Sequence, residues 1–303
     1  MRAVFLGTPS AAIASLGFLA EVADVVGVIT RPDRPRGRRR GPAAPPVKTA
    51  AKEWGFPIGQ PESRGELAAV LERAHADIGV VVAYGMLLDR RSLDATRVGF
   101  VNVHFSLLPR WRGAAPVEHS IIAGDTKTGV SLMSIDEGLD TGPIIAIVET
   151  DIAEDDTGGI LTARLSVLGA QLLANALPAF VNGALHPADQ IDTAATQAPR
   201  LTPAEARLDP ALPAEVLVRT VRALHPRPGA WLTVDTSRLG VLRAGWVPSG
   251  PDLGRIELIG GMPVMGTSDG GLVLLEVVAE GRRPQPGAAW MNGRRGEPAQ
   301  VRW

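Results

Sequence analysis

The first half of the chain alternates short, continuously apolar runs with amphipathic stretches, and this rhythm constrains the fold more than any other feature. Strands are predicted at residues 3–6, 25–30, 78–83, 98–103, 129–135 and 143–149. Helices are predicted at residues 11–22, 46–54, 66–74, 116–123 and 159–181. Because β-branched residues fill the runs without polar alternation, both faces of each strand are expected to be covered. The sequence therefore predicts an α/β domain with a mostly parallel sheet.

The second half has a different pattern. At 303 residues the chain is long for one compact domain, so two domains are expected. The first is expected to span residues 1–188, followed by a polar, Ala-rich linker at 189–206. Beyond Gly229, short apolar runs separated by Gly and Pro predict strands at 230–235, 239–247, 254–261, 262–268 and 271–281. Five strands with little helix favour a small OB-like β-barrel, so residues 207–303 form the predicted C-terminal domain.

Two helix starts are predicted ahead of these strands. Thr202-Pro203-Ala204-Glu205 has the form of a capping box with proline at the first helical position. The segment Pro213–Leu224 has clearer helical periodicity and is predicted as a helix.

Composition excludes several classes of site. The chain has no cysteine, which excludes thiol catalysis, disulfides and thiolate metal ligands. No His, Asp and Glu residues have the spacing of a metal site, so no metal is predicted. The N-terminal residues lack the apolar core of a signal peptide, and no window reaches the roughly 18 apolar residues of a membrane span. A soluble, cytoplasmic protein without a membrane partner is expected.

The stretch from Phe100 to Pro143 carries the candidate chemistry. Asn102 and His104 are separated by two positions at the end of an apolar run, so a strand would point both side chains the same way. A loop rich in Pro and Gly follows, and Asp140 comes later in the segment LDTG. An amide, an imidazole and a carboxylate brought to one strand edge make a plausible acyl-transfer site.

Each of these residues also has a structural alternative. Asn102 can cap a turn, and His104 can be a hydrogen-bonded structural histidine, with His119 as its rival for a catalytic role. An aspartate before Thr-Gly is common in turns, and Asp136 competes with Asp140. The pattern alone does not separate the two aspartates.

A basic segment, Arg31–Pro42, contains six Arg and one Asp in twelve residues. Its Pro and Gly residues predict an exposed loop, for which a solvated charged surface is the usual explanation. The loop leaves the carboxyl edge of the predicted sheet, where arginine side chains can pair with phosphates and stack on an unpaired base. RNA binding is therefore the favoured interpretation, although the net charge of −1 carries no such signal for the whole chain.

The wording of the candidate site resembles that of the folate-dependent formyltransferases. In that family an Asn-x-His pair is followed by SLLP, and a later Asp lies in an LDTG-like segment. The chain reads NVHFSLLPRWRGAAP and then LDTGP. The wording SLLPRWRGAAP is similar to that of the branch of the family that formylates methionyl initiator tRNA. The resemblance implies that Asn102, His104 and Asp140 are the catalytic residues, and it selects Asp140 over Asp136.

The resemblance also implies the substrates. The formyl donor is expected to be 10-formyltetrahydrofolate, a co-substrate, and the acceptor the α-amino group of methionyl initiator tRNA. The family plan is a Rossmann-like catalytic domain followed by a tRNA-binding barrel, and we expect a monomer. The folate site is expected to include Tyr84, Gly85, Met86, Ser106, Leu107, Leu108 and Pro109. The loop residues expected to contact tRNA are Arg36, Arg38, Arg39 and Arg40.

Under the same resemblance, Asn102 and protonated His104 donate to the oxyanion that forms when the amine attacks the formyl carbon. Other functions stay open at this point. A related enzyme could act on another amine, such as glycinamide ribonucleotide or an amino sugar, or on water as a deformylating hydrolase. A non-catalytic RNA-binding protein that keeps an old folate fold is an alternative of a different class.

Overall fold

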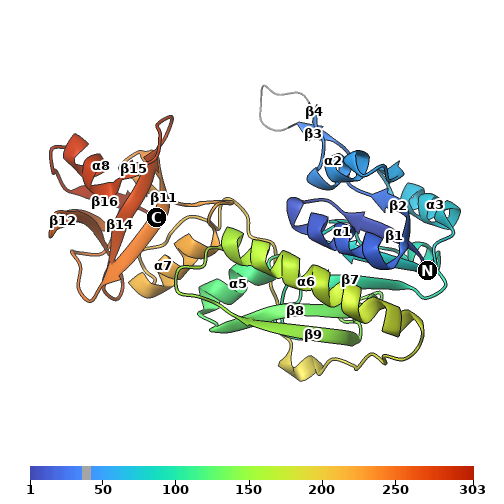
Figure 1. Cartoon of the computed structure of the whole chain (residues 1–303). Coiled ribbons are helices and arrows are strands. Elements are labelled where there is room, and N and C mark those ends of the chain that lie inside the picture. Colours follow the sequence, from blue (N-terminus) through green and yellow to red (C-terminus); the bar gives the residue numbers. More distant parts are fainter. Residues whose placement is uncertain (36–41) are drawn as a thin grey trace. The chain divides into compact units, whose positions relative to one another are not determined.

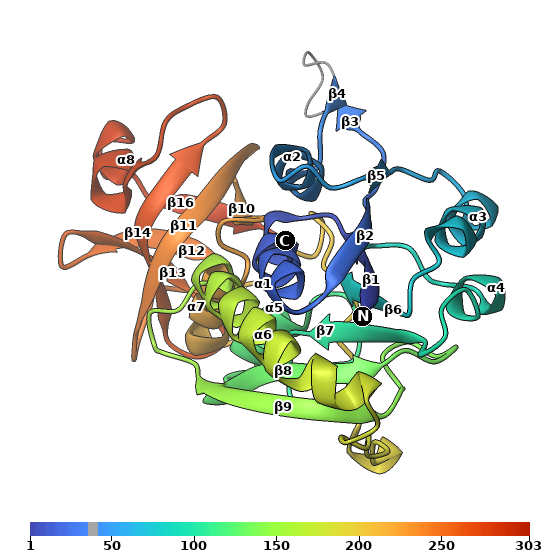
Figure 2. The ribbon, with the colours of Figure 1, turned by 45° about the vertical axis from the view of Figure 1, so that its right-hand side comes forward.

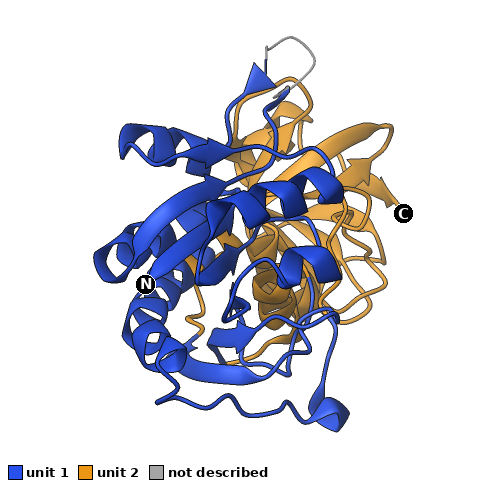
Figure 3. Cartoon of the chain, turned by 90° about the vertical axis from the view of Figure 1, so that its right-hand side faces the viewer, with its two compact units in different colours: residues 1–113, 127–151, 162–197 blue, residues 114–126, 152–161, 198–303 orange. Residues whose placement is uncertain are grey.

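The computed structural model describes residues 1–35 and 42–303 of the chain. Their contacts divide the chain into two compact units, which are coloured separately in Figure 3. The first unit contains residues 1–113, 127–151 and 162–197, and the second contains residues 114–126, 152–161 and 198–303. Two internal segments therefore group with the C-terminal residues, although they lie within the first 161 residues of the sequence.

A seven-stranded sheet forms the centre of the first unit (Figure 1), in the order β5-β2-β1-β6-β7-β8-β9. Its strands are β1 (Arg2–Gly7), β2 (Asp24–Ile29), β5 (Ile58–Gly59), β6 (Ile78–Val82), β7 (Phe100–His104), β8 (Lys127–Ser134) and β9 (Ile144–Asp151). The pairs from β5 through β7 are parallel, whereas β7–β8 and β8–β9 are antiparallel. The prediction of a mostly parallel sheet is confirmed.

Helices cover both faces of this sheet. They are α1 (Ile13–Val22), preceded by the 3-10 helix η1 (Ser10–Ala12), α2 (Pro46–Glu53), α3 (Arg64–Ala74), α4 (Arg90–Leu93) and most of α6 (Gly158–Val181). Leu67 and Leu71 of α3 pack with Val4 of β1 in one buried cluster. On the opposite face, α6 runs across β7, β8 and β9 in both views (Figure 1 and Figure 2). A Cβ on Gly169 of α6 would lie 2.7 Å from Val103 Cγ1, so glycine permits this close approach.

The helix α6 is long and apolar enough to cross a membrane by length and composition, and no other helix of residues 1–35 and 42–303 passes that test. A buried core helix passes it equally well. Leu165, Leu173 and Leu177 are fully buried, and Ser166 Oγ donates a hydrogen bond of 2.6 Å to the carbonyl oxygen of Ala11. These contacts identify α6 as a core helix of the protein.

An antiparallel barrel forms the centre of the second unit. Its strands are β10 (Ala230–Val234), β11 (Ser237–Val247), β12 (Arg255–Ile259), β13 (Met262–Gly266), β14 (Gly271–Ala279), β15 (Gln285–Pro286) and β16 (Ala299–Arg302). Their order is β11-β10-β16-β12-β13-β14-β15, and a further pairing of β11 with β14 closes the barrel. The helices α5 (Pro116–Ala123), α7 (Ala214–Ala223) and α8 (Gly287–Gly293) belong to this unit. The predicted small C-terminal barrel is confirmed.

The structure differs from the sequence prediction at several places within this unit, and the short strand β15 and the helix α8 were not predicted. The strand β16 has no counterpart among the predicted strands, yet it lies between β10 and β12 and completes the barrel. The capping box does form its contacts, since Thr202 N donates to Glu205 Oε2 at 2.7 Å and Glu205 N donates to Thr202 Oγ1 at 3.3 Å. No helix follows, because Arg207 enters a bridge with Trp231 instead. The backbone pairing of Arg207 overrides the local helix signal.

Of the basic segment Arg31–Pro42, the structure describes residues 31–35 and Pro42. The short strands β3 (Arg34–Pro35) and β4 (Pro42–Ala43) pair antiparallel there, and Asp33 accepts two hydrogen bonds of 2.8 Å from Lys48 Nζ. The hydrogen bonds from Lys48 lower the pKa of the Asp33 carboxyl group. The four arginines predicted to contact tRNA, Arg36, Arg38, Arg39 and Arg40, lie outside the described residues.

Candidate active site

Asn102 and His104 lie on the same face of β7, as their spacing predicts. The residue between them, Val103, points to the opposite face and packs against α6. This alternation follows from the two-residue period of a strand. His104 is only 6% exposed. The two polar side chains are therefore held by a strand that is anchored from behind by a core helix.

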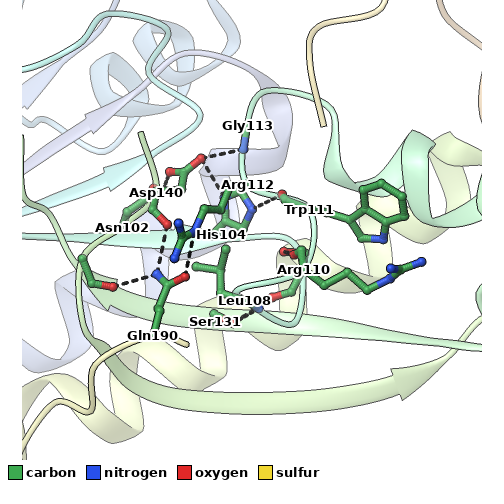
Figure 4. A network of polar contacts seen from close by, with 12 residues as sticks. Asn102, His104, Leu108, Arg110, Trp111, Arg112, Gly113, Ser131, Asp140 and Gln190 are labelled. Carbon is green, nitrogen blue, oxygen red and sulfur yellow. Dashed lines mark hydrogen bonds and ion pairs between the residues drawn. The ribbon is translucent and has the colours of Figure 1, made fainter. Parts of the chain in front are cut away.

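The connection between β8 and β9 brings Asp140 to these side chains (Figure 4). Asp140 Oδ1 accepts a hydrogen bond of 3.3 Å from Asn102 Nδ2, and Asp140 Oδ2 lies 3.6 Å from His104 Nδ1. The backbone N–H of Gly113 donates to Asp140 Oδ2 at 2.9 Å. The three predicted residues thus form one cluster, which we call the polar triad (Asn102, His104 and Asp140).

The orientation of the His104 ring is fixed by a backbone carbonyl. His104 Nε2 lies 2.9 Å from the carbonyl oxygen of Trp111. A carbonyl oxygen only accepts hydrogen bonds, so Nε2 must carry the hydrogen in this contact. The other ring nitrogen, Nδ1, then faces the Asp140 carboxylate. The imidazole is held between a carbonyl oxygen and a carboxylate.

Two residues that hold the triad have unusual backbone conformations. Trp111 has φ of 67° and Asp140 has φ of 54°, both in the left-handed region that favours glycine. Each such residue costs on the order of 1 kcal/mol or more and persists only where its surroundings enforce it. Left-handed non-glycine residues concentrate at functional sites, so this observation supports a functional role for the cluster.

Comparison with known proteins identifies the family. The formyl transferase family model matches residues 1–177, and the model of the formyl transferase C-terminal domain matches residues 200–295. A methionyl-tRNA formyltransferase from Halorhodospira halophila is 46% identical to this chain over 99% of both chains. The chain belongs to the formyl transferase family. The resemblance predicted from the sequence is confirmed, and the chain is a formyl-transferring enzyme.

Two solved structures share the fold of this chain. A methionyl-tRNA formyltransferase from Clostridium thermocellum has a TM-score of 0.56 and 19% identity, covering 81% of this chain and 93% of its own. An N-formyltransferase from Helicobacter canadensis, solved with folinic acid and dTDP-3-aminofucose, has a TM-score of 0.68 and 15% identity. That match covers 90% of this chain and 98% of the other. At these identities the comparison concerns the fold alone.

The loop after β7, which the sequence predicts as part of the folate site, is shaped by its own hydrogen bonds. Ser106 Oγ donates to the carbonyl oxygen of Arg110 at 2.6 Å. Ser131 Oγ accepts from Leu108 N at 3.0 Å and donates to the carbonyl oxygen of Ser106 at 2.8 Å. Ser106 and Leu108 are buried, whereas Leu107 and Pro109 are half-buried. The loop therefore has a defined shape, and its role in folate binding stays a prediction.

The second predicted folate segment follows β6. Tyr84 is 2% exposed and packs in the cluster of β1 and α3, and its carbonyl oxygen accepts from Thr8 Oγ1 at 2.9 Å. Burial raises the pKa of the Tyr84 phenol, and the nearby Arg31 guanidinium opposes this shift. Gly85 has φ of 80° and Met86 is partly buried. Since β6 and β7 are adjacent and parallel, both predicted folate segments leave the same edge of the sheet.

Asp136 and His119, the alternatives to Asp140 and His104, make other contacts. Asp136 is exposed, and its carboxylate accepts from Thr141 Oγ1 at 2.7 Å and from Gly138 N at 3.0 Å, which closes a turn. His119 belongs to the second unit, where its Nε2 lies 3.0 Å from the carbonyl oxygen of Pro199. Among residues 1–35 and 42–303, no group of three or more His, Asp or Glu is placed to hold a metal ion.

Two further side chains, Arg112 and Gln190, hold this cluster, and neither was predicted as a site residue. Arg112, only 5% exposed, donates from Nε to Gln190 Oε1 at 3.0 Å (Figure 4). Gln190 Nε2 in turn donates to the carbonyl oxygen of Asp140 at 2.9 Å. Arg112 lies inside the RWRG segment, which is a local signal. Gln190 lies in the predicted linker, 50 residues from Asp140, and no local pattern indicates its role.

Proposed function

We propose that this enzyme transfers the formyl group of 10-formyltetrahydrofolate to the α-amino group of methionyl initiator tRNA. The observation that carries the proposal is the polar triad, in which the Asp140 carboxylate lies 3.3 Å from the Asn102 amide nitrogen and 3.6 Å from His104 Nδ1. The relatives named methionyl-tRNA formyltransferase, which match along nearly the whole chain, support the choice of acceptor.

Asn102 and His104 are the donors to the oxyanion that develops when the amine attacks the formyl carbon. One N–H of the Asn102 amide donates to Asp140, and the second is available to the formyl oxygen. His104 donates from Nδ1 in its protonated form, while Nε2 keeps its bond to Trp111. A preorganised donor of this kind contributes about 3–4 kcal/mol to transition-state stabilisation.

Asp140 is the proton acceptor in this proposal. The neutral amine forms a C–N bond to the formyl carbon, and Asp140 takes the single proton that the amine nitrogen loses as the formamide forms; the same number of protons is then returned to N10 of the leaving folate. The bond between the formyl carbon and N10 of the folate breaks, and N10 gains a proton, so the reaction is balanced. The Gly113 N–H at 2.9 Å keeps the carboxylate aimed at this position throughout.

The edge of the sheet where β6 and β7 end is the proposed folate site. Tyr84, Gly85 and Met86 follow β6, and Ser106–Pro109 follow β7. The pterin would bind between these two segments, because ligands of doubly wound sheets bind outside the carboxyl ends of the strands. The complex of the Helicobacter canadensis relative with folinic acid supports a folate-binding role for this fold.

The tRNA acceptor is assigned to other parts of the chain. We propose that residues 1–188 carry the chemistry, that 189–206 link the domains, and that the barrel at 207–303 binds tRNA. The loop arginines predicted from the sequence are proposed to contact the acceptor end. We further propose that the protein is cytoplasmic and acts as a monomer.

A formylation assay tests the proposal directly. The purified enzyme would be incubated with 10-formyltetrahydrofolate and either initiator or elongator methionyl-tRNA, and N-formylmethionine released from the tRNA would be measured. We expect rapid formylation of the initiator species only. Formylation of an amino sugar or glycinamide ribonucleotide in place of methionyl-tRNA would move the enzyme to another branch of the family. Release of formate without an amine would identify a hydrolase.

A further inference from the structure

Residues 188–197, which begin at the last residue of the predicted first domain and continue into the predicted linker, bind along the candidate active site, and we call them the strap. At its start, Ala188 and Ile144 exchange two backbone hydrogen bonds of 2.7 and 2.8 Å. At its end, Thr196 holds the loop after β7. Thr196 Oγ1 accepts from Trp111 N at 2.9 Å, and its carbonyl oxygen accepts from Arg112 N at 2.9 Å. Both ends of the strap are therefore fixed to the unit that contains the polar triad.

The side chain of Gln190, near the start of the strap, adds a second link between the loop that carries Asp140 and the loop that carries Arg112 (Figure 4). Its Nε2 donates to the carbonyl oxygens of Asp140 at 2.9 Å and Gly142 at 2.8 Å. Its Oε1 accepts from Arg112 Nε at 3.0 Å. Two carbonyl oxygens require a donor and an arginine requires an acceptor, so only one orientation of the amide satisfies all three contacts. The network determines the placement of the side chain.

Arg112 carries this connection to the other members of the site. Its buried guanidinium also pairs with Asp192 of the strap at 2.8 Å. The residues on either side of Arg112 contact the triad directly, Trp111 through its carbonyl oxygen and Gly113 through its N–H. Gln190 therefore bridges two segments. One carries Asp140, and the other, residues 111–113, contacts both His104 and the Asp140 carboxylate.

The backbone of Asp140 needs such a support. Its φ of 54° is unfavourable for a residue with a side chain, and such a conformation persists only when surrounding contacts enforce it. A half-buried carbonyl oxygen that loses its donor also favours rearrangement toward water. We infer that Gln190 is a positioning residue of the formyl-transfer site, which fixes Asp140 relative to His104 without contacting substrate. The inference rests on the proposed catalytic role of the triad.

Loss of this support is expected to reduce turnover more than substrate binding. Positioning errors of about 1 Å can reduce rates about 100-fold, so we expect kcat of Gln190→Ala to fall by about 10- to 100-fold. The KM values for the folate and the tRNA should stay within about threefold, because Gln190 is proposed to contact neither. A control is Gln197→Ala, which removes an exposed glutamine of the same strap and leaves its backbone bridge to Arg112 in place.

A double-mutant comparison separates positioning from general damage. If Gln190 acts through Asp140, then Gln190→Ala should cost little once Asp140→Asn has already removed the carboxylate. We expect the second substitution to change single-turnover rates by less than about threefold in that background. Equal losses in the two backgrounds would overturn the inference, as would a Gln190→Ala enzyme with the kcat of Gln197→Ala.

A spectroscopic measurement tests the inference without relying on activity. The ring ¹⁵N resonances of His104, assigned by their loss in His104→Gln, report its contacts to Trp111 and Asp140. We expect these resonances to shift in Gln190→Ala and to stay unchanged in Gln197→Ala. Unchanged resonances in both variants would refute a positioning role. If the wild-type enzyme did not formylate methionyl-tRNA, the proposed acceptor would be wrong, while this measurement would still decide the role of Gln190.

Discussion

Gly142, two residues after Asp140, offers a sharp test of how the backbone positions this site. A Cβ at Gly142 would overlap the carbonyl oxygen of Ser134 in β8 and approach Met133 Cε at 3.3 Å. The clash with Ser134 involves backbone, so rotation of a side chain cannot relieve it. A carbon settles about 3.3–3.6 Å from a carbonyl oxygen, so the two backbone segments must separate by about 1.5 Å in Gly142→Ala.

This shift would reach the Asp140 carboxylate. The Gly142 carbonyl oxygen accepts from Gln190 Nε2, and Asp140 is two residues away on the same tight connection. We expect kcat to fall at least about 100-fold, because a misplacement of about 1 Å already has an effect of this size. Overpacking of this kind should also cost about 1–3 kcal/mol of unfolding free energy.

The assay compares single-turnover formylation and urea unfolding for Gly142→Ala and for a control, Gly65→Ala. Gly65 lies in α3 with no atom within 4 Å of an added Cβ, so alanine there should leave kcat unchanged and maintain or raise stability. A Gly142→Ala enzyme with wild-type turnover would show that the position of Asp140 does not depend on this close approach, and the positional argument would fail.

Three further perturbations have defined expectations. In steady-state kinetics, His104→Ala should lower kcat about 100- to 1,000-fold with little change in the KM for folate, while Asp136→Asn should keep near-normal turnover. Normal turnover in His104→Ala together with a large loss in Asp136→Asn would reassign the site. Replacing all four loop arginines by alanine should make the plot of log binding constant for tRNA against log salt concentration less steep, by about 0.7 for each phosphate that the loop no longer neutralises. An unchanged slope would show that the loop is a solvated surface. Ser63→Ala removes the hydroxyl that accepts from Glu66 N at 3.2 Å, and urea unfolding should show a decrease of about 1 kcal/mol in stability with activity unchanged.

Local patterns in the sequence were sufficient for much of this protein. The spacing of Asn102 and His104 predicts that both side chains share one face, because a strand repeats every two residues. The apolar runs predict the strands of the parallel sheet for a similar reason, since both faces of a central strand are covered. These features depend only on residues that are close together in the sequence, so the sequence alone is enough to predict them.

Tertiary structure decided what depends on distant residues. By local pattern alone Asp136 and Asp140 look equivalent, and only the family wording favours Asp140. The fold of the β8–β9 connection brings Asp140, 38 positions from Asn102, to the triad. Gln190 has no local signal because its three partners come from two loops 48 to 78 positions away. The strand β16 likewise is apparent only when it fills the gap between β10 and β12. Contacts of this kind arise from chain folding, so residue spacing along the sequence does not encode them locally.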